Sequence, residues 1–269
     1  MMSVEWILLY LMLGAFVGFM AGLLGVGGGG ILVPLLVTIF SYQNIGQENI
    51  VHLALGTSLA CMMISSSSSA YAHKIKGNVV WKMVFGMVPG ITIGTLMVTH
   101  IAADINATYI ALFFAAFMAL VAVQMFMNWK PKPSSRPTKL QSLIMAGAGI
   151  GSISALAAVG GGFLAVTYFT FKNIEMKKAV GNSAAIGLPI AITGTMGYLI
   201  SGWSKTLNDP YTYGFIYLPA FIVISIASFI TAPLGASYST NLPDKKLKRI
   251  FAIVSLLLSL KMLYSVFQH

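Results

Sequence analysis

The sequence has very few charged residues for its length. Aspartate and glutamate number 6 among 269 residues, and charged side chains make up 8% of the chain against 57% hydrophobic residues. Soluble domains carry about 25% charged residues. The chain therefore lacks the polar surface that a water-soluble globule needs, and we expect an all-α polytopic membrane protein.

Cysteine is also nearly absent. The single Cys61 excludes an intramolecular disulfide and a thiolate cluster for a metal. No Asp or Glu lies deep inside an apolar segment, which argues against a proton pump, a cation channel or a membrane-embedded enzyme. We predict no enzymatic activity, no catalytic residues, no metal and no cofactor.

Basic residues dominate the few charges that are present. Lysine and arginine number 16, which gives a formal net charge of +10. In a soluble protein this balance would suggest nucleic acid, whereas in a membrane protein it indicates basic cytoplasmic loops. We therefore predict a lipid bilayer and no nucleic acid as partner. The first 25 residues lack Lys, Arg and a cleavage site, which argues against a removed signal peptide.

Apolar segments divide the chain into blocks that can enter a membrane, since a spanning helix needs about 20 residues. The blocks cover residues 5–41, 51–72, 79–103, 106–129, 140–171, 179–201, 214–240 and 246–267. The basic linker 130–139 contains prolines and charges that cannot enter hydrocarbon. It separates a first repeat, residues 1–129, from a second repeat, residues 140–269.

The two halves carry similar features in the same order, as duplicated transporters do. Each has a glycine run, then a Gly-polar-Ser segment, then a proline. The matching segments are Gly27 to Gly30 with Gly160 to Gly162, Ala54-Leu-Gly-Thr-Ser58 with Ala179-Val-Gly-Asn-Ser183, and Val88-Pro89-Gly90 with Leu218-Pro219-Ala220. Because residue 159 is Val, the second glycine run lacks the Gly-x-Gly-Gly-Gly pattern of the first run.

The basic residues favour two hairpins that enter the membrane and return on the same side. If every block crosses, the basic residues divide almost equally between the two sides. If blocks 5–41 and 140–171 are broken, re-entrant hairpins, every basic loop residue except Lys205 falls inside. Each half then has one hairpin and three spans, and the halves are inverted repeats with both termini outside. Eight plain crossings are the alternative.

The glycine runs supply the first candidate binding residues. Gly tolerates positive φ, so each run can interrupt a helix and expose backbone N–H groups to an anion at the positive end of the restarting helix. Pro34 is expected in the first turn of that helix, where its missing N–H does no harm. Close helix packing is the alternative role for the glycines. The candidate residues are Gly27, Gly28, Gly29, Gly30, Gly160, Gly161 and Gly162.

Two polar segments could complete this site. Thr57 and Ser58 in the first half, and Asn182 and Ser183 in the second, place hydrogen-bond donors at equivalent points. Hydrogen bonding between helices is the alternative role for these side chains.

Other polar residues of block 51–72 are interpreted differently. The run from Ser65 to Ser69 sweeps more than one helical turn, so its members cannot share one face and are mostly interpreted as packing. His52 and His73, at the two ends of the block, are interpreted as interfacial histidines rather than proton carriers.

With these residues, nearly the whole chain resembles the sulfite exporter TauE/SafE family, also called the 4-toluene sulfonate uptake permeases. The resemblance implies a prokaryotic-type inner-membrane transporter for sulfite, organosulfonates or related sulfur or carboxylate anions. It is carried by Gly18-Phe-Met-Ala-Gly-Leu-Leu-Gly-Val-Gly-Gly-Gly-Gly-Ile-Leu-Val-Pro34, Ala54-Leu-Gly-Thr-Ser58, Gly160-Gly-Gly162, Ala179-Val-Gly-Asn-Ser183 and Pro233-Leu-Gly-Ala236.

These observations predict a secondary transporter that moves a small anion by alternating access, most simply as export driven by the membrane potential. The anion would bind between the hairpin breaks and the Gly-Thr-Ser and Gly-Asn-Ser segments. Carbonyls freed at the breaks could bind Na⁺, so coupling to Na⁺ or H⁺ stays open, as does the oligomeric state. An anion channel is the alternative function.

Overall fold

The computed structural model describes residues 3–25, 27–127, 139–206, 210–239 and 243–268. This part of the chain forms α-helices, two single-turn 3-10 helices (η1 and η2) and one short β-hairpin. The elements are α1 (Val4–Leu24), α2 (Gly29–Gln43), η1 (Gln47–Asn49), α3 (Ile50–Ile75), α4 (Trp81–Ala102), α5 (Ala107–Phe126), α6 (Leu140–Ala157), α7 (Gly162–Phe171), α8 (Met176–Gly202), η2 (Trp203–Lys205), β1 (Thr212–Tyr213), β2 (Ile216–Tyr217), α9 (Leu218–Ser239) and α10 (Asp244–Gln268). The expected linker 130–139 lies outside the described residues except for Lys139.

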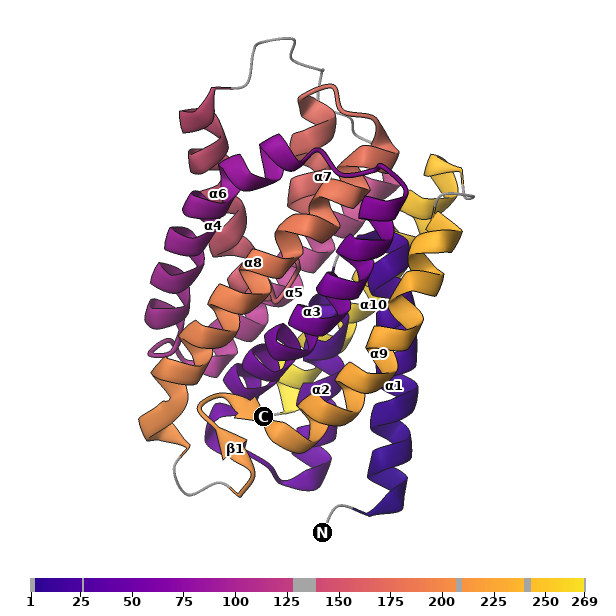
Figure 1. Ribbon diagram of the computed structural model, residues 1–269. Helices are drawn as coiled ribbons and strands as arrows, with labels where there is room; N and C mark the ends of the chain where they lie inside the picture. The colour runs from indigo at the N-terminus through magenta and orange to yellow at the C-terminus, as the bar shows by residue number, and fades with distance from the viewer. Residues whose placement is uncertain (1–2, 26, 128–138, 207–209, 240–242, 269) are drawn as a thin grey trace.

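The long helices form one elongated bundle (Figure 1). Within the described residues, 8 helices are long and apolar enough to cross a membrane, and the shorter apolar helices are α2 and α7. Large apolar side chains such as Phe85, Ile93 and Phe229 are exposed on the outside of the bundle. An apolar exterior is what contact with lipid requires, and the predicted class of all-α polytopic membrane protein is confirmed.

Each glycine run interrupts a helix, as predicted. Helix α1 ends at Gly25, where φ is 67°, and α2 begins after Gly28, where φ is 78°. Helix α6 ends at Ala158, where φ is 47°, and α7 begins after Gly161, where φ is 73°. These left-handed residues cannot continue an α-helix, so the chain turns and each short helix folds back within the bundle.

The expected place of Pro34 is wrong by one turn. Because α2 begins at Gly29, Pro34 lies inside the helix rather than in its first turn. A proline at this position lacks the N–H that would reach the carbonyl of Gly30, so the start of α2 keeps an unpaired intrahelical acceptor. The proline therefore weakens the helix close to its break.

Close contacts between long helices recur in the two halves. Helix α1 packs on α9, and α6 packs on α4, with glycines of α1 and α6 lying against the partner backbone. The spacing of the contacts is the same in both pairs. The matching contacts are Gly14 with Ile224, Gly18 with Ser228, Gly147 with Met87 and Gly151 with Ile91.

This contact register corrects two details of the sequence comparison. It aligns Met87 with Ile224, so Pro89 corresponds to Ile226 and not to Pro219. It also aligns Gly25 with Ala158, which makes Ala158, rather than Val159, the departure from the first glycine run. Ala158 still adopts the left-handed conformation of Gly25, so the two breaks have the same geometry despite the substitution.

The block expected at 214–240 begins with strand instead of helix. Strands β1 and β2 pair antiparallel, with Thr212 opposite Tyr217, and α9 starts only at Leu218. The hairpin lies at the end of the bundle where α1 begins and α10 finishes, which we call the terminal end (Figure 1).

The opposite end of the bundle holds the starts of α4, α6, α8 and α10 (Figure 1). It carries most of the described basic residues, so we call it the basic end. Lys205, in η2, lies instead at the terminal end. The expected basic residues Lys130, Lys132 and Arg136 lie outside the described residues. The described basic residues of this end are Lys74, Lys76, Lys82, Lys139, Lys172, Lys177, Lys178, Lys246 and Arg249.

Candidate functional site

Helices α3 and α8 run antiparallel through the centre of the bundle, and both helix breaks reach them (Figure 1). The hydroxyl of Ser183, in α8, lies 2.9 Å from the carbonyl oxygen of Gly25 and 3.2 Å from that of Gly162. One buried side chain therefore connects the breaks of both hairpins. Ser183 was predicted as a site residue, and it lies between the two breaks.

The two breaks also touch each other directly. A Cβ atom on Gly29 would overlap the carbonyl oxygen of Ala158, and one on Gly30 would lie 2.6 Å from Cγ2 of Val159. Glycine is needed at these positions because any side chain would push the hairpins apart. The predicted glycines of both runs are thus brought together in the buried centre of the protein.

Both short helices start at this meeting point. Gly29 and Gly162 are the first residues of α2 and α7, so their N–H groups have no acceptor within the helix. Neither N–H group donates a hydrogen bond to an acceptor among the described residues. Two positive helix ends therefore lie in one buried region, which is an arrangement that can stabilise an anion.

Thr57 and Asn182 occupy equivalent positions and make equivalent contacts. Thr57 Oγ1 accepts a hydrogen bond from the backbone N–H of Tyr217 at 2.9 Å. Asn182 Oδ1 accepts one from the N–H of Val80 at 2.6 Å. Because a backbone N–H can only donate, the amide oxygen of Asn182 must face Val80, and its NH₂ group must point elsewhere.

Three buried donors of α3 and α8 have no hydrogen-bond partner among the described residues. They are the hydroxyls of Ser58 and Ser66 and the NH₂ group of Asn182. All three residues have 0% exposed surface. An unsatisfied buried polar group costs about 1–3 kcal/mol, so these groups are candidates for donating to a ligand.

Ser65 and Ser66 are functional candidates that the sequence interpretation missed. Ser65 Oγ donates to the carbonyl oxygen of Gly27 at 2.7 Å. Ser66 Oγ would lie 2.7 Å from a Cβ atom on Gly27 and 2.9 Å from one on Gly187. The serine run was visible in the sequence, but the neighbours that give each serine its role come from distant helices.

A wide cavity opens at the terminal end. It has a volume of about 650 Å³ and is lined by aromatic and amide side chains, including Trp6, Tyr42, Gln43 and Tyr211. Tyr217 also lines it, and the N–H of this residue is bound to Thr57. The cavity therefore comes within one residue of the predicted Gly-Thr-Ser segment.

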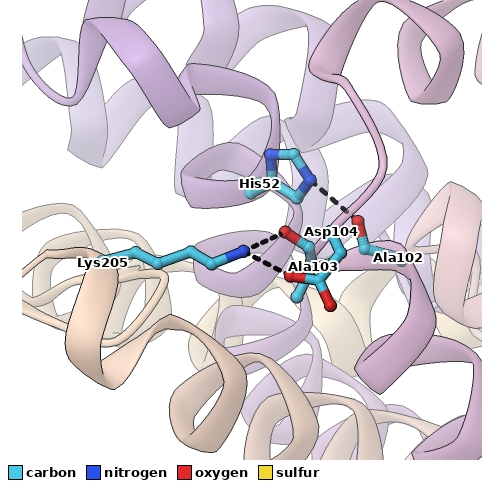
Figure 2. A network of polar contacts seen from close by, with 5 residues as sticks. All are labelled: His52, Ala102, Ala103, Asp104 and Lys205. Atoms are coloured by element: carbon cyan, nitrogen blue, oxygen red, sulfur yellow. Dashed lines mark hydrogen bonds and ion pairs between the residues drawn. The ribbon is translucent and has the colours of Figure 1, made fainter.

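A polar network ties helices together at the same end (Figure 2). Lys205 Nζ donates to the carbonyl oxygen of Ala103 at 2.6 Å and to Asp104 Oδ1 at 2.7 Å. Nε2 of His52 lies 3.0 Å from the carbonyl oxygen of Ala102. The hydrogen bond and charge of Lys205 hold the pKa of the exposed Asp104 carboxyl below its usual range. The network caps the C-terminus of α4 with cationic and imidazole groups.

Comparison with known proteins gives a consistent result. The chain matches the family model described as Sulfite exporter TauE/SafE over residues 10–262. It is 34% identical over 258 residues to a probable membrane transporter protein of Haemophilus influenzae, covering 96% of this chain and 98% of that protein. It is 26% identical over 257 residues to a probable membrane transporter protein of Methanocaldococcus jannaschii, covering 95% and 94%. No solved structure matches the chain.

Proposed function

Because the chain belongs to the sulfite exporter TauE/SafE family, we propose that this membrane transporter carries a small oxyanion across the inner membrane by alternating access. Sulfite, organosulfonates and related sulfur or carboxylate anions are the substrate class. The substrate-binding residues are Gly27, Gly28, Gly29, Gly30, Thr57, Ser58, Gly160, Gly161, Gly162, Asn182 and Ser183.

The observation that carries this proposal is the meeting of two helix starts in a buried region with unpartnered donors. Among the described residues, the N–H groups of Gly29 and Gly162, the hydroxyl of Ser58 and the NH₂ group of Asn182 have no hydrogen-bond acceptor. Donors and positive helix ends favour an anion without a buried lysine or arginine. The direct contact of the breaks supports a carrier more than a channel, which needs a continuous path.

The repeated contacts support two inverted repeats with the basic end in the cytoplasm and both termini outside. The two halves would rock about the central site. Expelling one negative charge from an inside-negative cell gains about 2.3 kcal/mol per 100 mV, which favours export. Coupling to Na⁺ or H⁺ is compatible with this scheme. A cysteine replacing Glu175, in the turn before α8, should react with an impermeant reagent only from the cytoplasm.

Purified protein in proteoliposomes tests the function. Uptake and counterflow of labelled sulfite, sulfate, thiosulfate, 4-toluenesulfonate and acetate should saturate for at least one anion. Gly29→Ala should abolish that flux because its methyl group overlaps Ala158. Gly149→Ala is the matched control, since a Cβ atom there meets nothing within 4 Å. Flux without saturation or counterflow would indicate the alternative, an anion channel, and no flux of any anion would contradict the proposal.

A further inference from the structure

Helix α3 carries a buried polar stripe that extends beyond the proposed binding residue Ser58. Its residues follow helical spacing on one face, within roughly 80° of each other. We call the set the α3 stripe: Ser58, Met62, Ser66, Ser69 and His73. Every member is buried, with no residue of the set more than 2% exposed.

The hydroxyls of the α3 stripe are unsatisfied. Those of Ser58, Ser66 and Ser69 have no hydrogen-bond partner among the described residues. The ring of His73 lies against the backbone of Gly22, in α1. The neighbours of Ser66 and Ser69 in the same serine run behave differently. Ser67 Oγ donates to Met63 within its own helix, and Ser68 Oγ donates to the carbonyl oxygen of Phe229 at 3.0 Å. Within the run from Ser65 to Ser69, the hydroxyls without a partner among the described residues are therefore those of Ser66 and Ser69.

Helix α8 carries an equivalent stripe. When the spacing of the α3 stripe is counted from Ser183 instead of Ser58, it selects small residues of α8 followed by a buried aromatic residue. We call this set the α8 stripe: Ser183, Gly187, Ala191, Gly194 and Tyr198. Tyr198 has 0% exposed surface, and its hydroxyl has no partner among the described residues. Tyr198 thus takes the place in α8 that His73 takes in α3.

The two stripes meet at the helix breaks and then separate. Ser66 lies against the backbone of Gly187, and Gly187 lies against Gly160 of the second break. From this crossing the α3 stripe runs to His73 near the basic end. The α8 stripe runs the opposite way to Tyr198, whose ring lies 6.2 Å from that of Phe215 near the terminal end.

We infer that these stripes line the two halves of the anion's route, the α3 stripe toward the basic end and the α8 stripe toward the terminal end. The inference rests on the proposed transport of a small anion. The α3 stripe offers hydroxyl and imidazole donors, which can replace the hydration of an anion step by step. His73 and Tyr198 close the outer limits of the two half-routes.

Cysteine labelling in sealed vesicles of both orientations tests the route. The background is Cys61→Ala, which removes the single native thiol. Ser69→Cys should react from the basic end and Ala191→Cys from the terminal end. Relative to their rates with a free thiol, the anionic reagent MTSES, itself a small sulfonate, should react faster than the cationic MTSET at Ser69→Cys. The control is Ser67→Cys, on another face of the same run, which should react with neither.

Two outcomes would overturn the inference: no reaction at Ser69→Cys and Ala191→Cys, or equal reaction at Ser67→Cys. Flux of the five labelled anions through vesicles of unmodified protein is measured in parallel. If an anion is transported but either of these labelling results is obtained, the route is rejected and the transport function stands. Absence of flux would reject the transport function itself.

Discussion

Replacing Ser66 with alanine separates a structural role from a transport role. Its hydroxyl is fully buried and has no hydrogen-bond partner among the described residues. Since an unsatisfied buried hydroxyl costs about 1–3 kcal/mol, Ser66→Ala should leave the free energy of unfolding unchanged or raise it. If Ser66 donates to a bound anion, the variant loses a charge-assisted hydrogen bond worth about 1.5–3 kcal/mol. The affinity for the anion should then fall by about 10- to 150-fold.

Two measurements on detergent-solubilised protein check this expectation. Thermal unfolding gives the stability, and equilibrium binding of the best anion from the flux assay gives the affinity. Ser67→Ala is the control because the Ser67 hydroxyl bonds within its own helix and its side chain is only half-buried. Unchanged affinity in Ser66→Ala, or an equal loss in Ser67→Ala, would refute the reasoning.

Four further substitutions test the breaks and the terminal end. Ser183→Ala leaves two buried carbonyls without their hydroxyl, and should lower the unfolding free energy by about 1–3 kcal/mol in chemical denaturation. Gly161→Ala, at φ 73°, should lower the free energy of unfolding by about 1–2 kcal/mol, whereas Ala158→Gly, at φ 47°, should leave it unchanged or raise it. The opposite order of stabilities would contradict the left-handed conformation of the two breaks. Lys205 lowers the pKa of Asp104 in the folded protein. The ion pair therefore stabilises the fold fully above the unfolded Asp pKa of about 3.9, and this stabilisation is lost as the pH falls through the pKa of Asp104 in the folded protein. Lys205→Ala should remove this acid-dependent part of the thermal midpoint, and an unchanged pH profile would count against the pairing.

The sequence predicts the fold well where a physical signal is local. Block 5–41 corresponds to α1 and α2, and block 140–171 corresponds to α6 and α7, because glycine runs break helices wherever they occur. Hydropathy alone cannot find the start of α9 at Leu218, since the preceding β-strand is equally apolar. It also cannot separate one apolar arm of a hairpin from a full crossing.

The candidate site is less visible in the sequence because its roles depend on distant partners. Equal spacing pairs Thr57 with Asn182, yet only the structure reveals that both accept a hydrogen bond from a backbone N–H outside the long helices. Ser65 and Ser66 are adjacent and chemically identical. One is held by the carbonyl of Gly27, and the other has no partner among the described residues. Nothing local to the run distinguishes them.

The contact between the breaks explains how positive helix ends can be buried without an acidic residue beside them. Ala158 ends α6, and its carbonyl oxygen lies against Gly29, the first residue of α2. The negative end of one helix therefore faces the positive end of another, which is an attractive arrangement of the two helix dipoles. An anion arriving at Gly29 must compete with this carbonyl, and it carries a full charge where the carbonyl carries only a partial one. We therefore expect anion binding to loosen the contact between the two hairpins, which is the movement that alternating access between two rocking halves requires.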